Sequence, residues 1–449
     1  MGMTQSGKFG FSLVAAGAIF LCLNIPRMFN SPGSMMDFRT AYSSARCLLR
    51  RCDPYNPKDV LRIYKAEGGA RSSDSDADRF SLPRNNYLPL EFAVTVPFAL
   101  LPFGVAQALW VVLTVGSFVM GAFLMWDLGA YHAPELAGGL VGFLLAYSEQ
   151  IVFYGNLAGF AVPFCMIAVW CFLRNKFLML GTMAFAISLA VKPHDVVLVW
   201  VYFLLAGGTF RKWALRTAAV AAAFSLPTVL WVTHIAPYWI QELRSNIQAF
   251  GIHGGGIDVS LAAIDNHGTC LIANLQSVFA VFRDDPRFYN HVTYFVFAPM
   301  LLVWSIVTLR ARLTLATTWL AIAAIAPLSM LPMYHRIYDA KIIMLTIPAC
   351  ALLWAEGGRI GRLALIITAA SCVVTGDLVW SVYFEILVKL RLLPAVSPGP
   401  LLGASINIPL PLSLLVLAGF YLVVYVRRAS FAVSKEEPAH LEYAATPHT

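Results

Sequence analysis

The sequence has little charge. Lys, Arg, Asp and Glu together make up 12% of its 449 residues, whereas 59% are hydrophobic. Soluble domains usually carry about 25% charged residues, so a water-soluble protein of this composition would lack the polar groups to cover its surface. The hydrophobic residues come in long runs, and a bilayer core needs about 20 of them per helix. The composition therefore predicts an all-α polytopic membrane protein.

Motifs for metals, cofactors and nucleic acids are also lacking. The eight cysteines form no C-x-x-C pair and no zinc spacing, so we expect no metal site and no cofactor. The net charge of +8 is not arranged as a basic stripe with interleaved aromatics, so nucleic acid is not an expected partner. Cys47 and Cys52 are close enough to form a disulfide in an oxidising compartment, but the sequence favours the alternative of two free thiols.

Apolar runs of the required kind recur along the whole chain. The first follows Lys8 and has no small-residue cleavage site after it, so we interpret it as an uncleaved span. The expected spans are 9–29, 105–127, 136–154, 157–173, 177–191, 194–207, 212–234, 291–309, 313–332, 338–355, 362–385 and 409–426.

Short clusters of Lys and Arg at the ends of these runs predict the topology. All of them fall on one side of the proposed arrangement, which the positive-inside rule identifies as the cytoplasmic side. The clusters are Arg174 with Lys176, Arg211 with Lys212 and Arg216, Arg310 with Arg312, Arg359 with Arg362, and Arg427 with Arg428. The opposite face then carries the polar segments 31–86, 235–290 and 333–339.

Two of the expected spans are short and meet at Lys192-Pro193-His194-Asp195. Proline interrupts a helix, and charged groups at such a break in a membrane protein are costly, which points to a function. The alternative is one long kinked helix whose lysine extends to the interface. That alternative would reverse the side of every upstream segment and spoil the charge pattern.

Asp37 is the strongest candidate for a catalytic residue. It follows the first span and stands among Met35, Met36 and Phe38, near the expected headgroup boundary. Partial desolvation raises the pKa of a carboxylate, which suits a general base. Asp37 would also serve as the N-cap of a helix beginning at Phe38, and the two roles are compatible.

The segments after Asp37 are expected to lie at the membrane surface. Residues 38–51 combine apolar positions at helical spacing with four arginines, which predicts an amphipathic helix lying on the lipid phosphates. Residues 88–102 are apolar but short and contain three prolines, which predicts a re-entrant or interfacial segment.

Several motifs in this order resemble a known family. Residues 37–42 (DFRTAY) and 53–57 (DPYNP) resemble the start of the bacterial glycosyltransferase family 87, which includes polyprenyl-phosphate-mannose-dependent α-mannosyltransferases. Further similarities are 87–90 (YLPL), Gly155-Asn156 and 190–193 (AVKP), so the resemblance covers about residues 30–350. Asn156 stands where the family usually has Gln, and Leu90 where it has a second Pro.

The resemblance implies a GT-C type bundle of about twelve transmembrane helices with outward loops and interfacial helices. Residues 1–428 would form this single domain, with a disordered cytoplasmic tail over 429–449. The protein would lie in the bacterial plasma membrane and use a polyprenyl-phosphate-linked sugar, with mannose as the sugar that the family implies, from the extracytoplasmic side. The acceptor would be a lipid or glycan, and Asp37 would be the catalytic base.

The remaining candidate residues are assigned by their charge and position. Preorganised cations would stabilise the departing phosphate, and the candidates for this role are Lys192, Arg336 and His335. Weaker candidates for contacts to sugar or acceptor are Tyr55, Asn156, His194 and Asp195. Arg336 would alternatively be an interface anchor. The rival function is a transporter or flippase, which explains the spans equally well but not the long first outer loop.

Overall fold

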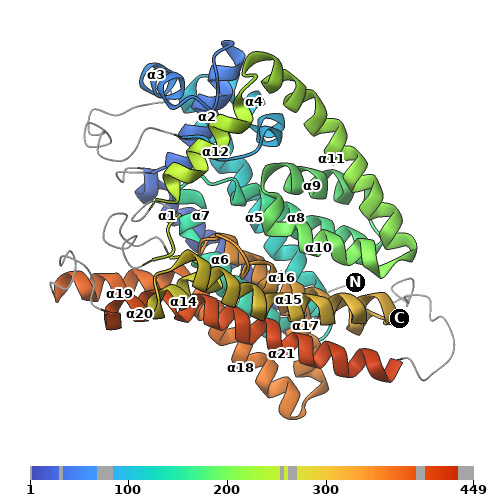
Figure 1. Ribbon diagram of the computed structural model, residues 1–449. Coiled ribbons are helices and arrows are strands. Elements are labelled where there is room, and N and C mark those ends of the chain that lie inside the picture. Colours follow the sequence, from blue (N-terminus) through green and yellow to red (C-terminus); the bar gives the residue numbers. More distant parts are fainter. Residues whose placement is uncertain are drawn as a thin grey trace.

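The computed structural model describes residues 3–29, 34–67, 84–252, 257–260, 271–390 and 400–432. Helices form nearly all regular structure in these ranges, and the isolated β-bridge there pairs Ile272 with Arg336. Long helices cross the lower part of the molecule and others slant along its right side, with shorter helices at the upper left (Figure 1). The prediction of an all-α protein is confirmed for the described part of the chain.

Long apolar helices show that the chain is a multi-pass membrane protein. Among the described residues, seven helical segments are long and apolar enough to cross a bilayer, and each overlaps an expected span. They are α1 (Gln5–Phe29), α5 (Phe103–Ala130), α6 (Pro134–Ala146) continued by α7 (Glu149–Phe153), α11 (Gly208–Ile235), α15 (Pro286–Arg310), α18 (Gly358–Thr375) and α21 (Pro409–Ala432).

Shorter apolar helices occupy the other five expected spans. They are α8 (Ala158–Arg174), α9 (Leu178–Val191), α10 (Pro193–Ala206), α16 (Leu315–Ser329), and the 3-10 helix η3 (Asp339–Thr346) continued by α17 (Ile347–Glu356). Most side chains of α8 and α16 are covered by protein. A bilayer core needs about 20 helical residues, so a count of twelve complete crossings stays a prediction.

Small residues bring α1 and α6 into close contact. A Cβ atom added to Gly142 would lie 2.5 Å from the carbonyl oxygen of Leu13, and one added to Gly17 would lie 2.3 Å from the carbonyl oxygen of Gly142. Gly138 meets the backbone of Gly10 in the same way. Close backbone approach through glycines is a common way for helices to pack inside a membrane, where the hydrophobic effect does not drive association.

The break at Lys192 separates α9 from α10. Lys192 adopts an extended conformation with φ −151° and ψ 75°, and Pro193 is the first residue of α10. The backbone of Lys192 therefore interrupts the helical hydrogen bonding, and α9 and α10 are two separate helices (Figure 1). The alternative of one long kinked helix was wrong.

The segment after the first span is more deeply packed than the sequence predicts. Helix α2 (Met36–Leu49) contacts α3 (Pro57–Glu67) and α4 (Phe92–Ala99), and most of its residues are buried. Arg39 is only 4% exposed, and Arg46 pairs with Glu67 at 2.5 Å. The prediction that the arginines of α2 form a basic face on the lipid was therefore wrong for these two residues, because Arg39 is buried in protein and the half-buried Arg46 is paired with Glu67.

A disulfide joins Cys47 to Cys52 at the end of α2. The spacing of the two cysteines in the sequence allowed this disulfide but did not decide it. The residues predicted to form an interfacial segment make the short 3-10 helix η2 (Pro89–Glu91) and the eight-residue helix α4, neither of which is long enough to cross a bilayer.

The remaining helices are α12 (Trp239–Phe250), α14 (Leu275–Phe282), α19 (Asp377–Lys389) and α20 (Pro400–Asn407). Helix α21 continues to Ala432, so the expected tail begins at least four residues later than 429. Residues 433–449 lie outside the described residues, as do parts of both long polar segments, 68–83 and 261–270.

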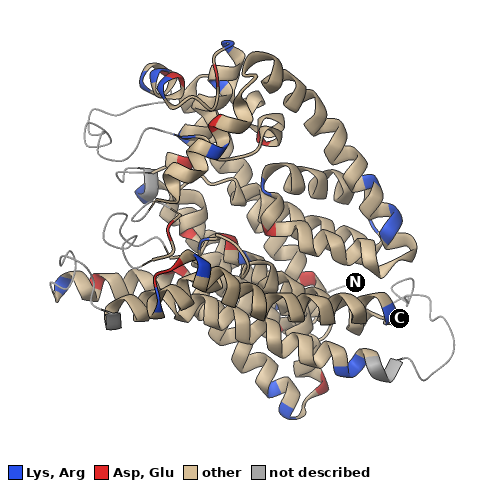
Figure 2. Cartoon of the chain, viewed as in Figure 1, with Lys and Arg blue, Asp and Glu red and all other residues tan. Residues whose placement is uncertain are grey.

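The basic helix ends share one side of the molecule. Figure 2 shows Lys and Arg at the start of α11, the end of α15, the start of α18 and the end of α21, all toward the right and lower right. Helices α2, α3 and α12 lie toward the upper left in the same view. Figure 2 also shows Lys and Arg at the upper left, where acidic residues accompany them. The assignment of the basic helix ends to the cytoplasmic side stays a prediction.

Candidate functional site

The backbone around Asp37 is tied to the chain between α7 and α8. The backbone amide of Met35 donates to the carbonyl of Phe153 at 2.6 Å, and the backbone amide of Asp37 donates to the carbonyl of Tyr154 at 3.0 Å. Helix α2 begins at Met36, so Asp37 lies in its first turn and is not the N-cap. The half-buried carboxylate thus stands at a helix N-terminus, where the helix dipole favours negative charge.

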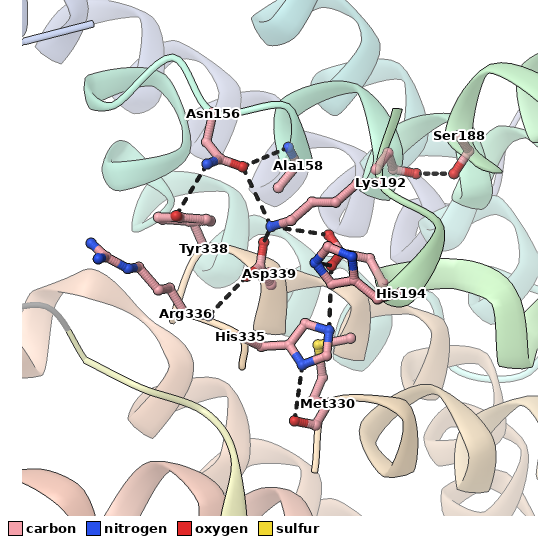
Figure 3. A network of polar contacts seen from close by, with 12 residues as sticks. Asn156, Ala158, Ser188, Lys192, His194, Met330, His335, Arg336, Tyr338 and Asp339 are labelled. Atoms are coloured by element: carbon pink, nitrogen blue, oxygen red, sulfur yellow. Dashed lines mark hydrogen bonds and ion pairs between the residues drawn. The ribbon is translucent and has the colours of Figure 1, made fainter. Parts of the chain in front are cut away.

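Asn156 connects Asp37 to the rest of a polar network. Its Nδ2 lies 2.7 Å from Oδ2 of Asp37, 3.0 Å from the hydroxyl of Tyr87 and 3.1 Å from the hydroxyl of Tyr338, so its two N–H groups are shared among three acceptors. Its Oδ1 accepts the backbone N–H of Ala158 at 2.9 Å and lies 3.4 Å from Nζ of Lys192 (Figure 3). The amide is therefore fixed with its nitrogen toward the carboxylate and its oxygen toward the lysine.

Lys192 is buried and paired with two carboxylates. Its side chain is 6% exposed, and its ammonium group donates to Oδ1 of Asp339 and lies 3.6 Å from Oδ2 of Asp195. The ammonium group also stands 5.2 Å from the ring centroid of Tyr338. A lysine extending to the interface would place its ammonium group in water, so that alternative was wrong.

Arg336 reaches the network from the turn before η3. Its backbone N–H donates to Oδ2 of Asp339 at 2.8 Å, and its Nε donates to the hydroxyl of Tyr334. The half-buried guanidinium group is close enough to act on Asp37 by its charge. Arg336 and Lys192 therefore converge on one region from segments far apart in the sequence.

Opposing influences set the basicity of Asp37. Burial raises its pKa above the ordinary value, and the hydrogen bond from Asn156 and the charges of Arg336 and Lys192 counteract part of this rise. Burial and the negative charge of Asp37 also raise the pKa of Tyr87, which keeps that hydroxyl protonated. The raised pKa of Asp37 agrees with the direction expected from its sequence position.

A second cluster adjoins Lys192. Nε2 of His194 and Nε2 of His335 each lie 3.4 Å from Oδ1 of Asp195. Asp195 and His335 are fully buried, and the side chain of His194 is 30% exposed. These three residues are grouped closely enough to hold a metal ion, which the sequence did not predict. The expectation of no metal site rested on local spacing, and His335 lies far along the chain from the other two.

Tyr55 does not join the network. Its fully buried hydroxyl donates to the carbonyl of Tyr87 at 2.9 Å, and its ring packs against Phe92 and Trp239. This contact supports the backbone of a residue that touches Asn156, so Tyr55 positions the site from outside. The predicted role of Tyr55 in sugar contacts has no support from this placement.

Three members of the network were not among the predicted site residues, namely Tyr87, Tyr338 and Asp339. Tyr338 and Asp339 belong to the polar turn 333–339 that the sequence places outside, which was the available signal. Their importance depends on Asp339 pairing with Lys192, a contact across 147 residues.

Comparison with protein-family models, curated proteins and solved structures finds no match for this chain.

Chemically, the site combines a basic carboxylate with buried cations. A carboxylate of raised pKa can remove a proton from a hydroxyl group. Lys192 and Arg336 can attract an anionic group placed beside the same carboxylate. Together these features suit a reaction in which a hydroxyl attacks and an anion leaves.

Proposed function

We propose that this protein is a membrane glycosyltransferase that moves a hexose, with mannose as the first candidate, from a polyprenyl-phosphate donor to a hydroxyl of a lipid or glycan acceptor. The observation that carries the proposal is the convergence of Asp37 and Lys192 on opposite ends of the Asn156 amide, which lies within hydrogen-bonding reach of both. The family resemblance of the motifs containing these residues supports the same chemistry.

In the proposed reaction Asp37 removes the proton of the acceptor hydroxyl. The acceptor oxygen forms a bond to the anomeric carbon as the bond from that carbon to the phosphate oxygen breaks. The electron pair of the broken bond leaves with the polyprenyl phosphate, and the sugar inverts at the anomeric carbon. Lys192 and Arg336 stabilise the charge that builds up on the phosphate, as preorganised cations do in a site shielded from water.

The proposed location is the extracytoplasmic side of a bacterial plasma membrane. Lys192 and the basic cluster of Arg211 and Lys212 flank opposite ends of α10, which has 14 residues and spans about 20 Å. If the basic cluster is cytoplasmic, Lys192 faces the other leaflet. The disulfide at the end of α2 supports this side, because disulfides persist in oxidising compartments.

A transporter or flippase is the second candidate. The specific observation in its favour is the buried Lys192–Asp339 pair at a break between two short helices, because transporters place coupling sites at interrupted helices. Such a protein would move a substrate without changing a covalent bond, so the two candidates differ in their products.

The test is a membrane assay with radiolabelled polyprenyl-phosphate mannose, comparing the wild type with Asp37→Ala and with the control Asp59→Ala on α3. Asp59 is a surface residue paired with Arg62, so its loss should leave transfer unchanged. We expect Asp37→Ala to lose about 10²–10⁴-fold in rate, the usual contribution of a general base. Undiminished transfer in Asp37→Ala would remove the assigned base, and substrate movement without any new glycosidic bond would favour the transporter.

A further inference from the structure

The cluster next to Lys192 has the geometry of a metal site. Nε2 of His194 and Nε2 of His335 both face Oδ1 of Asp195, each at 3.4 Å. Ligand atoms that each lie about 2.1 Å from a tetrahedral zinc ion are about 3.4 Å apart. In an octahedral site of the same bond length, neighbouring ligands would be only about 3.0 Å apart. These two separations match those of a tetrahedral site, and the two histidine nitrogens lie within 4.8 Å of each other.

The hydrogen bonding of His335 decides which of its nitrogens is available. Its Nδ1 lies 3.1 Å from the carbonyl oxygen of Met330 and 3.0 Å from that of Met333. Both neighbours are acceptors, so Nδ1 must carry the proton. In the neutral ring, Nε2 then presents a lone pair to the carboxylate of Asp195. A backbone carbonyl that fixes the tautomer in this way is the usual outer partner of a metal-binding histidine.

Buried polar atoms of the cluster lack hydrogen bonds among the described residues, although Oδ2 of Asp195 has the ammonium group of Lys192 nearby. Within the part of the chain that the structure describes, Nε2 of His335 and both oxygens of Asp195 are buried and have no hydrogen-bond partner. Buried polar atoms are normally satisfied, and each exception calls for an explanation such as a bound ion. The lone pair on Nε2 of His335 faces a carboxylate oxygen, and a cation bound between the two atoms would relieve their repulsion.

The two oxygens of Asp195 divide between the neighbouring charges. Oδ2 lies 3.6 Å from Nζ of Lys192, whereas Oδ1 faces the two histidines. The ammonium group is already paired with Asp339, which reduces its repulsion of a cation at Oδ1. The side chain of His194 is 30% exposed, so the cluster is reachable from that side.

From these relationships we propose that His194, Asp195 and His335 bind a divalent transition-metal ion of the zinc class in a tetrahedral site with one position left for water or another ligand. Zinc sites with three protein ligands and one open position commonly take two histidines and one carboxylate. The proposal is defined by metal binding and stands independently of the proposed sugar transfer.

The test measures zinc retained by the purified full-length protein in detergent. The protein is stripped with a chelator, incubated with Zn²⁺, desalted and analysed by mass spectrometry of the metal content. We expect retention of one zinc ion per chain by the wild type and by His291→Gln, a control that changes an exposed histidine on α15. Asp195→Asn, His194→Gln and His335→Asn each remove a proposed ligand, so we expect each to lower zinc affinity. The loss should exceed the about 10–100-fold that is typical when a residue hydrogen-bonded to a metal ligand is changed.

Cobalt substitution supplies a second readout. Tetrahedral Co²⁺ absorbs visible light much more strongly than octahedral Co²⁺, so we expect intense bands in the wild type that His194→Gln abolishes. His194 is partly exposed, so this variant decides the matter even where a change at the buried His335 prevents folding. Equal zinc retention by the wild type and His194→Gln, no retention by the wild type, or a weak octahedral spectrum would each overturn the proposal.

Discussion

Nδ2 of Asn156 donates a 2.7 Å hydrogen bond to Oδ2 of Asp37, a residue 119 positions earlier in the chain. The oxygen of the same amide lies 3.4 Å from Nζ of Lys192. One neutral side chain thus separates a carboxylate from an ammonium group that would otherwise pair directly. This separation leaves the carboxylate available to accept a proton from a substrate.

Replacing Asn156 by Ala should shift the pH dependence of transfer. The hydrogen bond from Asn156 lowers the pKa of Asp37, so its removal should raise that pKa further. A general base acts in its deprotonated form, so the acidic limb of the kcat/KM profile should move to higher pH. The measurement is kcat/KM for sugar transfer over a pH series.

The control for this experiment is Asn175→Ala. Asn175 follows α8 at the end opposite to Asn156, so its replacement should leave the acidic limb in place. A profile for Asn156→Ala that keeps the wild-type limb while the overall rate falls would show that the amide does not set the basicity of Asp37.

Breaking the buried pair of Lys192 and Asp339 should destabilise the protein strongly. Lys192→Met leaves the buried carboxylate of Asp339 without its cation, and loss of one partner of a buried pair costs about 3–5 kcal/mol. The exposed pair of Arg428 and Glu356 is the comparison, and Glu356→Gln should cost about 0–1 kcal/mol. Thermal unfolding in detergent measures both changes.

A double variant distinguishes the loss of one charge of the pair from the loss of both. Lys192→Met combined with Asp339→Leu removes both charges of the pair, so it should recover part of the stability lost in Lys192→Met. Asp195 still faces position 192 and keeps the recovery incomplete. Full additivity of the two single changes would argue against the pairing.

Gly142→Ala should destabilise the contact between α1 and α6. A Cβ at this position would lie 2.5 Å from the carbonyl oxygen of Leu13, so the helices must separate, at a cost of about 1–3 kcal/mol. Gly116 on α5 is the matched control, since a Cβ there meets nothing within 4 Å. Gly116→Ala should be neutral or stabilising, because alanine favours helix more than glycine does. Equal unfolding temperatures for the two variants would contradict this account.

The topology predicts which engineered cysteines react in intact cells. Lys58→Cys on α3 should react with a membrane-impermeant maleimide, whereas Arg359→Cys at the start of α18 should react only after permeabilisation. Both positions are exposed, so the difference reports the side of the membrane. Replacing the exposed Cys22 by Ser in both variants removes a competing thiol. Labelling of both cysteines in intact cells would contradict the assignment of sides.

The expected spans followed from the length of the apolar runs, which can be read from the sequence without knowing how the helices pack. The break at Lys192 was likewise predictable, because proline limits the conformation of its neighbours regardless of context. Asp37 was singled out by its position after the first span, and the raised pKa depends on burial that a boundary position favours.

The partners of these residues required the tertiary structure. Asp339 pairs with Lys192 across 147 residues, and His335 joins His194 and Asp195 from an equally distant segment. Such contacts depend on how α10, α16 and η3 pack, and apolar periodicity inside a membrane protein carries little information about packing partners. The burial of α2 was missed for the same reason, since an amphipathic pattern does not distinguish a lipid surface from a protein surface. The sequence by itself therefore determined which segments form apolar helices and where charged residues interrupt them, while only the tertiary structure decided which of those charges meet.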